Sequence, residues 1–85
     1  MFVIVVYDVD EKRVNIVNKY LKRYLFWVQN SVFEGDISKD LMDRMINGLE
    51  KILKDNDSAV IYVFNGFKVE RKVLGRTRGF IDNIL

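Results

Sequence analysis

The sequence predicts an α+β domain built as a two-layer sandwich, with two helices on one face of an antiparallel sheet. Three observations lead to this fold class. An unbroken apolar stretch begins the chain, a second lies at residues 58–64, and two segments with helical spacing alternate with the strand-like segments. The 85 residues suffice for one small core, and an apolar content of 49% favours a folded chain.

Residues 2–8 should form a strand in the interior of the sheet. Apolar residues, mostly β-branched or aromatic, run without a break from Phe2 to Tyr7 and end at Asp8. Asp8 therefore ends the predicted central strand, a position where α/β sheets commonly bind ligands. The alternative is an ordinary helix-capping role for Asp8 or Asp10.

A basic amphipathic helix should follow, with Asp10 as its N-cap. Its apolar stripe consists of Val14, Val17, Leu21, Tyr24 and Leu25, widened by Ile16 and Tyr20. Residues 12–33 contain no acidic residue and five basic ones, which are Lys12, Arg13, Lys19, Lys22 and Arg23. A second basic zone begins at residue 67 and includes Arg76 and Arg78. Two such zones indicate an anionic partner, although solvated faces that aid solubility explain them equally well.

The rest of the chain predicts a second helix and three or four further strand segments. Residues 26–37 form either one bent strand or a hairpin that turns near Asn30 and Ser31. Ser38 caps the second helix, whose stripe runs from Met42 to Leu53. A central strand at 58–64 leads through Asn65-Gly66, a strong hairpin dipeptide, into a half-exposed edge strand at 67–74.

This order of elements is that of a ferredoxin-like βαββαβ sandwich with an extra C-terminal strand. Residues 1–75 would form the domain, and residues 76–85 a tail. Both sets of alternating residues in the first strand are apolar, but two helices can cover only one sheet face. A second copy of the chain is the simplest cover for the other face, so we expect a homodimer.

Composition excludes several kinds of site. The chain has no cysteine and no histidine, which rules out zinc sites of the usual kind, thiol nucleophiles and imidazole catalysis. A metal would have to be a hard cation held by oxygen, such as Mg²⁺ or Mn²⁺. No apolar run approaches the roughly 20 residues of a membrane span, and no signal peptide is recognisable, so we expect a cytoplasmic protein without a membrane partner.

Three segments carry a family resemblance: Val-Ile-Val-Val-Tyr-Asp-Val at 3–9, Val-Gln-Asn-Ser-Val-Phe-Glu-Gly at 28–35, and Lys-Val-Leu-Gly at 72–75. Together they resemble the small core adaptation protein of CRISPR systems, a ferredoxin-like homodimer known as a metal-dependent endoribonuclease. The block at 28–35 is the most specific of the three. Trp27 departs from the pattern, since many relatives carry arginine there.

The resemblance implies roles for particular residues. Asp8 matches the acid that binds magnesium across the dimer axis, Tyr7 and Phe33 match positions of the ribonuclease site, and Ser31 matches a serine that shapes the dimer cleft. The family dimer also holds duplex DNA between two dimers of the CRISPR integrase, commonly through its C-terminal segment. In this chain the tail offers an apolar cluster for that contact, made of Phe80, Ile81, Ile84 and Leu85.

These considerations rank three functions. The first is a CRISPR adaptation protein that binds duplex nucleic acid as a scaffold for the integrase, with a magnesium-dependent endoribonuclease activity on single-stranded RNA. The second is primarily a metal-dependent endonuclease of the mRNA-interferase kind, in which metal-activated water attacks the phosphodiester. The third is a ferredoxin-like regulatory module for a small ligand, which would need a glycine-rich turn that residues 8–11 lack.

Overall fold

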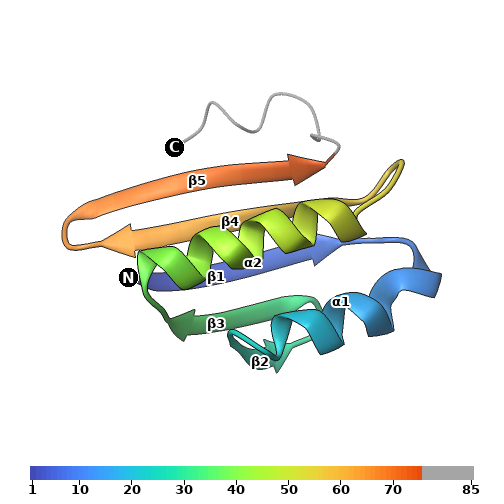
Figure 1. Ribbon diagram of the computed structural model, residues 1–85, viewed down its shortest axis with the longest axis horizontal. Coiled ribbons are helices and arrows are strands. Elements are labelled where there is room, and N and C mark those ends of the chain that lie inside the picture. The colour runs from blue at the N-terminus through green and yellow to red at the C-terminus, as the bar shows by residue number, and fades with distance from the viewer. Residues whose placement is uncertain (76–85) are drawn as a thin grey trace.

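Strand β1 (Phe2–Asp8) occupies the centre of a five-stranded antiparallel sheet in the computed structural model, which describes residues 1–75 (Figure 1). The strand order is β2-β3-β1-β4-β5. β1 pairs with β3 (Val32–Asp36) on one side and with β4 (Ser58–Asn65) on the other. The predicted α+β, ferredoxin-like sandwich with an added C-terminal strand is therefore confirmed.

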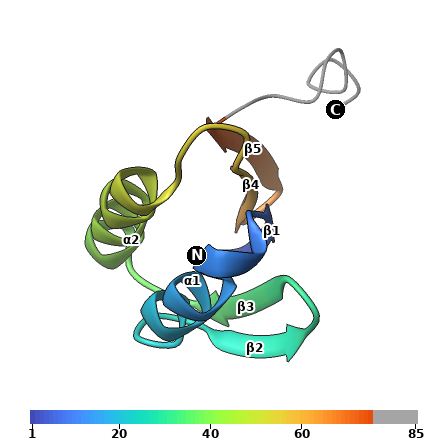
Figure 2. The same ribbon diagram turned by 90° about the vertical axis from the view of Figure 1, so that its right-hand side faces the viewer.

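The two helices lie on the same face of the sheet, as Figure 2 shows. The first begins as a 3₁₀ turn, η1 (Glu11–Arg13), and continues as α1 (Val14–Leu21); the second is α2 (Lys39–Ile52). Asp10 caps η1 by accepting a hydrogen bond from the Lys12 amide at 3.0 Å. Both helices bury a narrow apolar stripe, made of Val17, Leu21, Met42, Met45 and Leu49.

Ile16 does not widen this stripe, contrary to the prediction. Its side chain is 53% exposed, because a residue one position before Val17 lies about 100° around a helix of 3.6 residues per turn. Tyr20 does join the stripe, and its hydroxyl donates to the Arg44 and Met45 carbonyls at 3.1 Å. Gly48 makes this contact possible, since a Cβ there would lie 2.0 Å from the Tyr20 hydroxyl.

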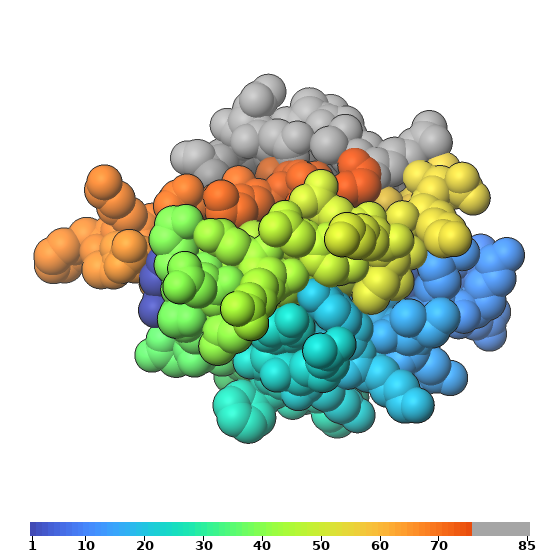
Figure 3. All heavy atoms as spheres, viewed as in Figure 1, coloured from blue at the N-terminus to red at the C-terminus, as the bar shows by residue number. Residues whose placement is uncertain are grey.

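Two hairpins complete the sheet. The segment whose form the sequence left open is a hairpin between β2 (Phe26–Gln29) and β3, and it turns at Asn30 with φ of 45°. β4 and β5 (Lys68–Gly75) form the predicted Asn65-Gly66 hairpin, in which Gly66 has φ of 63°. The tip of this hairpin projects beyond the rest of the molecule (Figure 3), and Phe67 on it is fully exposed. β5 is an edge strand, as predicted.

The two faces of the sheet differ in their cover. Val3, Val5 and Tyr7 point toward the helices and are at most 4% exposed. The alternate residues of β1 point away and align with residues of β4, which in turn align with β5. We call this surface the open face; its apolar residues are Phe2, Ile4, Val6, Val60, Tyr62, Phe64, Val69 and Val73. In the described residues no helix covers it, and Phe2, Val6 and Phe64 remain 36–39% exposed.

Among the described residues, neither helix has the length and apolarity that a membrane crossing requires. The predicted tail contacts of Arg76, Arg78, Phe80, Ile81, Ile84 and Leu85 lie outside the described residues.

Candidate functional site

Asp8 is the last residue of β1 and lies opposite Ser58, the first residue of β4. Its side chain is exposed and, by the alternation of the strand, shares the side of the sheet occupied by Phe2, Ile4 and Val6. A shallow pocket of about 280 Å³ lies beside it. The pocket is lined by Asp8, Val9, Asp10, Lys12, Arg13, Asp55, Asn56 and Asp57.

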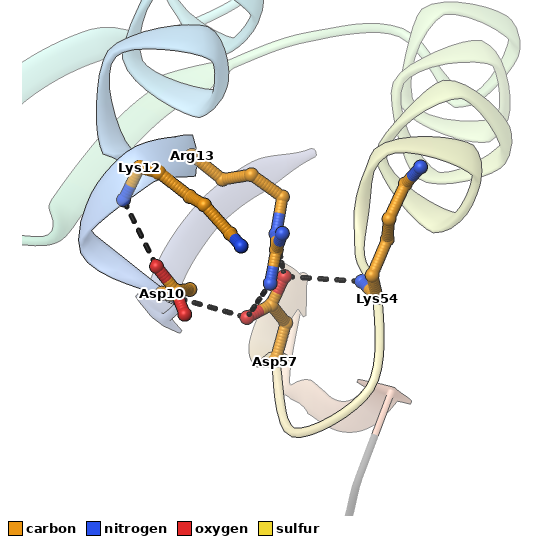
Figure 4. Close-up of polar contacts among 5 residues, drawn as sticks. All are labelled: Asp10, Lys12, Arg13, Lys54 and Asp57. Carbon is orange, nitrogen blue, oxygen red and sulfur yellow. Dashed lines mark hydrogen bonds and ion pairs between the residues drawn. The ribbon is translucent and has the colours of Figure 1, made fainter.

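Asp57 organises the polar contacts of this pocket (Figure 4). One carboxylate oxygen accepts from the Asp10 amide at 2.8 Å and from Arg13 Nη2 at 3.1 Å. The other accepts from Arg13 Nε at 2.5 Å and from the Lys54 amide at 3.0 Å. Only 2% of Asp57 is exposed. The hydrogen bond from Arg13 is the main cause that lowers the pKa of Asp57 to about 2; burial opposes it, and the two amides contribute to the lowering.

Sequence reasoning missed Asp57, which it treated only as part of a helix end. The signal was nevertheless present. β1 and β4 are both apolar central strands, and if they are antiparallel neighbours, the residues after β1 and before β4 must meet. An arginine after the first strand and an aspartate before the other are then candidates for an ion pair.

Arg13 therefore differs from the other predicted nucleic-acid contacts. Its side chain is 13% exposed and bound to Asp57, whereas Lys12, Lys19, Lys22 and Arg23 are exposed. Lys19 and Lys22 line a shallow groove of about 410 Å³ along the outer side of α1. The Arg23 guanidinium lies 5.7 Å and 5.9 Å from the ring centres of Tyr20 and Tyr24.

Tyr7 and Phe33 are not brought together with Asp8. Both belong to the helix-covered face, where Tyr7 is 4% and Phe33 0% exposed, and their ring centres lie 6.4 Å apart. The Tyr7 hydroxyl hydrogen-bonds to Asn18 Oδ1 of α1. Burial raises the pKa of Tyr7, and a hydrogen bond with the Ser31 side chain acts in the opposite direction. A catalytic role for these two residues stays a prediction, and from this position it would act through the packing under β1.

The donor chemistry at Asp8 fits a hard divalent cation, but one chain supplies few ligands. A carboxylate oxygen is the donor that Mg²⁺ and Mn²⁺ prefer. Within residues 1–75 no three acidic side chains are grouped so that they could hold a metal ion. In the pocket, Asp57 is engaged by Arg13 and two amides, and Asp10 caps η1. A metal site at Asp8 would therefore need ligands from a second copy, water or phosphate.

Known proteins similar to this chain all point to one family. The family described as CRISPR associated protein Cas2 matches residues 1–72. The CRISPR-associated endoribonuclease Cas2 of Methanocaldococcus jannaschii is 44% identical over all of this chain and 76% of that protein. The protein of the same name from Pyrococcus furiosus is 43% identical over the full length of both. A solved structure titled "Crystal structure of cas2" is 48% identical, covers all of this chain and 98% of its own, and superposes with a TM-score of 0.75. The chain therefore belongs to the CRISPR-associated Cas2 family.

Proposed function

We propose that this protein is a metal-dependent endoribonuclease of a CRISPR system and that it works as a homodimer with the two Asp8 residues facing each other. The observation that carries the proposal is the position of Asp8 at the end of the central strand, on the same side as the open face. The names of the relatives from M. jannaschii and P. furiosus support the activity.

The open face supports the dimer. It consists of aligned apolar residues on three neighbouring strands, and the edge strand β5 extends it with Val69 and Val73. The polar residues of β5, such as Lys68 and Glu70, lie on the other side. A contiguous apolar surface of this kind costs free energy in water, and a second copy offers a surface of matching chemistry.

Joining two open faces would also assemble the reaction site. Two facing Asp8 carboxylates would repel each other, and together they would supply the oxygen donors that one chain lacks. Mg²⁺ or Mn²⁺ bound by these carboxylates would offset the repulsion and supply activation of water for attack on a phosphodiester. Lys12 lines the same pocket and would attract the RNA phosphate.

Replacing Asp8 tests the activity directly. We expect Asp8→Asn to abolish magnesium-dependent cleavage of single-stranded RNA, because the amide keeps the shape of the side chain but removes the charge that attracts the cation. Cleavage is measured on an end-labelled RNA with and without a chelator. The matched control is Asp43→Asn on α2, which removes an exposed carboxylate paired with Lys39 and should cleave like the wild type. Unchanged cleavage by Asp8→Asn would assign the activity to another site.

A second function, a duplex-DNA scaffold that contacts the CRISPR integrase, is favoured by the exposed cations of the first helix. Lys12, Lys19, Lys22 and Arg23 lie on the exposed side of this segment. Dimerisation would double this surface and give two symmetric tracks for phosphates. Contact with the integrase is assigned to the segment after Gly75, on the basis of its sequence.

The double variant Lys19→Glu/Lys22→Glu tests the duplex-binding surface. Removing phosphate contacts should weaken binding equally for all sequences, and the slope of log affinity against log salt should fall by about 1 for each lysine that contacts a phosphate. Binding is measured by fluorescence anisotropy at several salt concentrations. Lys51→Glu on α2 serves as the control, since Lys51 is exposed on the other helix. If the double variant keeps wild-type affinity and slope, DNA does not bind along α1.

A further inference from the structure

We propose that Asp57 is a positioning residue for Asp8: by binding Arg13 and the backbone of Asp10, it fixes the segment after β1 against the start of β4. The inference rests on the endoribonuclease function proposed above and adds to it a residue that does not need to touch RNA. We call Asp10, Arg13, Lys54 and Asp57 together the Asp57 clamp.

The clamp joins three segments that are separate in the sequence. Its donors come from the loop after β1, from η1 and from the end of α2, and all of them converge on one carboxylate (Figure 4). Each oxygen of Asp57 accepts two hydrogen bonds, and Arg13 binds both oxygens with two nitrogens. Such a two-point contact fixes orientation as well as distance, which a lysine in place of the arginine could not do.

The place of the clamp makes it decisive for Asp8. Asp8 is held on one side by its pairing with Ser58, the residue next to Asp57, and is followed after Val9 by Asp10, whose amide binds Asp57. The end of β1 is thus fixed on both sides of Asp8. Without the clamp, Asp8 would be the last paired residue of a strand whose following segment is held less firmly, and strand ends of that kind are the least stable parts of a sheet.

The end of β5 packs against the same residue. Gly75 has φ of 74°, and a Cβ at this position would lie 2.2 Å from the Asp57 carbonyl oxygen. The main chain of Asp57 is therefore enclosed by β5 while its side chain is enclosed by the clamp. This enclosure leaves Asp57 unable to reorient, as the support of a reaction site requires.

An ion pair that only stabilises the fold would produce different consequences from one that positions Asp8. Loss of general stability changes the folded fraction and leaves the activity of folded molecules unaltered. Loss of positioning lowers kcat in molecules that are fully folded and changes KM little, because the substrate still binds. Loss of a phosphate contact from Arg13 would instead raise KM.

The test compares Asp57→Asn and Arg13→Gln with the control Asp43→Asn, which breaks the exposed Lys39–Asp43 pair. Circular dichroism first identifies a temperature at which every variant is folded. At that temperature, kcat and KM are measured for Mg²⁺-dependent cleavage of a single-stranded RNA, and hydrogen exchange is followed at the amides of residues 8–10. If Asp57→Asn does not fold, Arg13→Gln, which leaves the carboxylate with its two backbone donors, carries the test together with Arg13→Lys.

The proposal predicts that the clamp variants lose roughly tenfold or more in kcat, as is typical when the support of a ligand residue is removed, with little change in KM. Their Asp10 amide should exchange faster, Arg13→Lys should recover part of the loss, and Asp43→Asn should match the wild type. Wild-type kcat in the folded clamp variants, or a rise in KM alone, would overturn the proposal. If the wild type cleaves no RNA, the endoribonuclease function fails, and unchanged exchange at Asp10 would then overturn the clamp separately.

Discussion

At the scale of single residues, Asp8 and Asp57 lie at neighbouring strand ends in opposite surroundings. Asp57 is 2% exposed and accepts hydrogen bonds from an arginine and two amides, whereas Asp8 is exposed beside the pocket. An enclosed carboxylate with its acceptor sites occupied stabilises structure, and an exposed one at a strand end can meet a ligand. This difference assigns support to Asp57 and reaction chemistry to Asp8.

The lowered pKa of Asp57 predicts how stability depends on pH. The pKa falls from an ordinary value of 3.8 to about 2, chiefly because Arg13 hydrogen-bonds to the charged form. The corresponding stability is fully present above about pH 4 and is lost as the pH falls from about 4 to about 2, by roughly 2 kcal/mol at most. Urea unfolding at pH 5 and at pH 2.5 should show this loss in the wild type and a smaller one in Asp57→Asn. Equal losses in both proteins would contradict the assignment.

At the scale of elements, sequence reasoning succeeded where a strong local pattern coincided with burial. The apolar runs of β1 and β4, the Asn65-Gly66 turn and the helix cap at Ser38 were all predictable, because each depends on neighbouring residues. The position of Asp8 at the end of β1 followed from the same pattern.

Other features could not be predicted because they depend on contacts between distant segments. The hairpin at Asn30 is set by pairing of β2 with β3, and the exposure of Ile16 by which side of α1 meets the sheet. The partner of Arg13 was missed for the same reason, since Asp57 is 44 residues away in sequence.

The glycine at the end of β5 provides a test at this scale. Gly75→Ala should destabilise the fold more than Gly66→Ala, although both residues have positive φ, because only Gly75 faces a backbone oxygen at 2.2 Å from the added Cβ. We expect about 1 kcal/mol for Gly66→Ala, from backbone strain alone, and roughly 3 kcal/mol or more for Gly75→Ala. Denaturant unfolding of both variants measures the difference. Similar values would mean that β5 does not pack closely against Asp57.

At the scale of the whole molecule, the central feature is a sheet with two apolar faces and helices on only one of them. Sequence reasoning anticipated the uncovered face, since both sets of alternating residues in β1 are apolar. The structure adds that β4 and β5 continue this face in register and that Asp8 lies on the same side. One contact between two copies would therefore remove the apolar surface from water and bring both carboxylates to a shared site.

Cross-linking at position 8 tests this account most directly, because the chain contains no cysteine and a single introduced thiol is unambiguous. In the Asp8→Cys variant, a short bifunctional thiol reagent should join two chains rapidly into a species of twice the 10.1 kDa chain mass. Glu50→Cys on the exposed side of α2 should cross-link far more slowly. Equal and slow cross-linking of both variants, with light scattering that detects only single chains at micromolar concentration, would contradict a dimer that brings the Asp8 residues face to face.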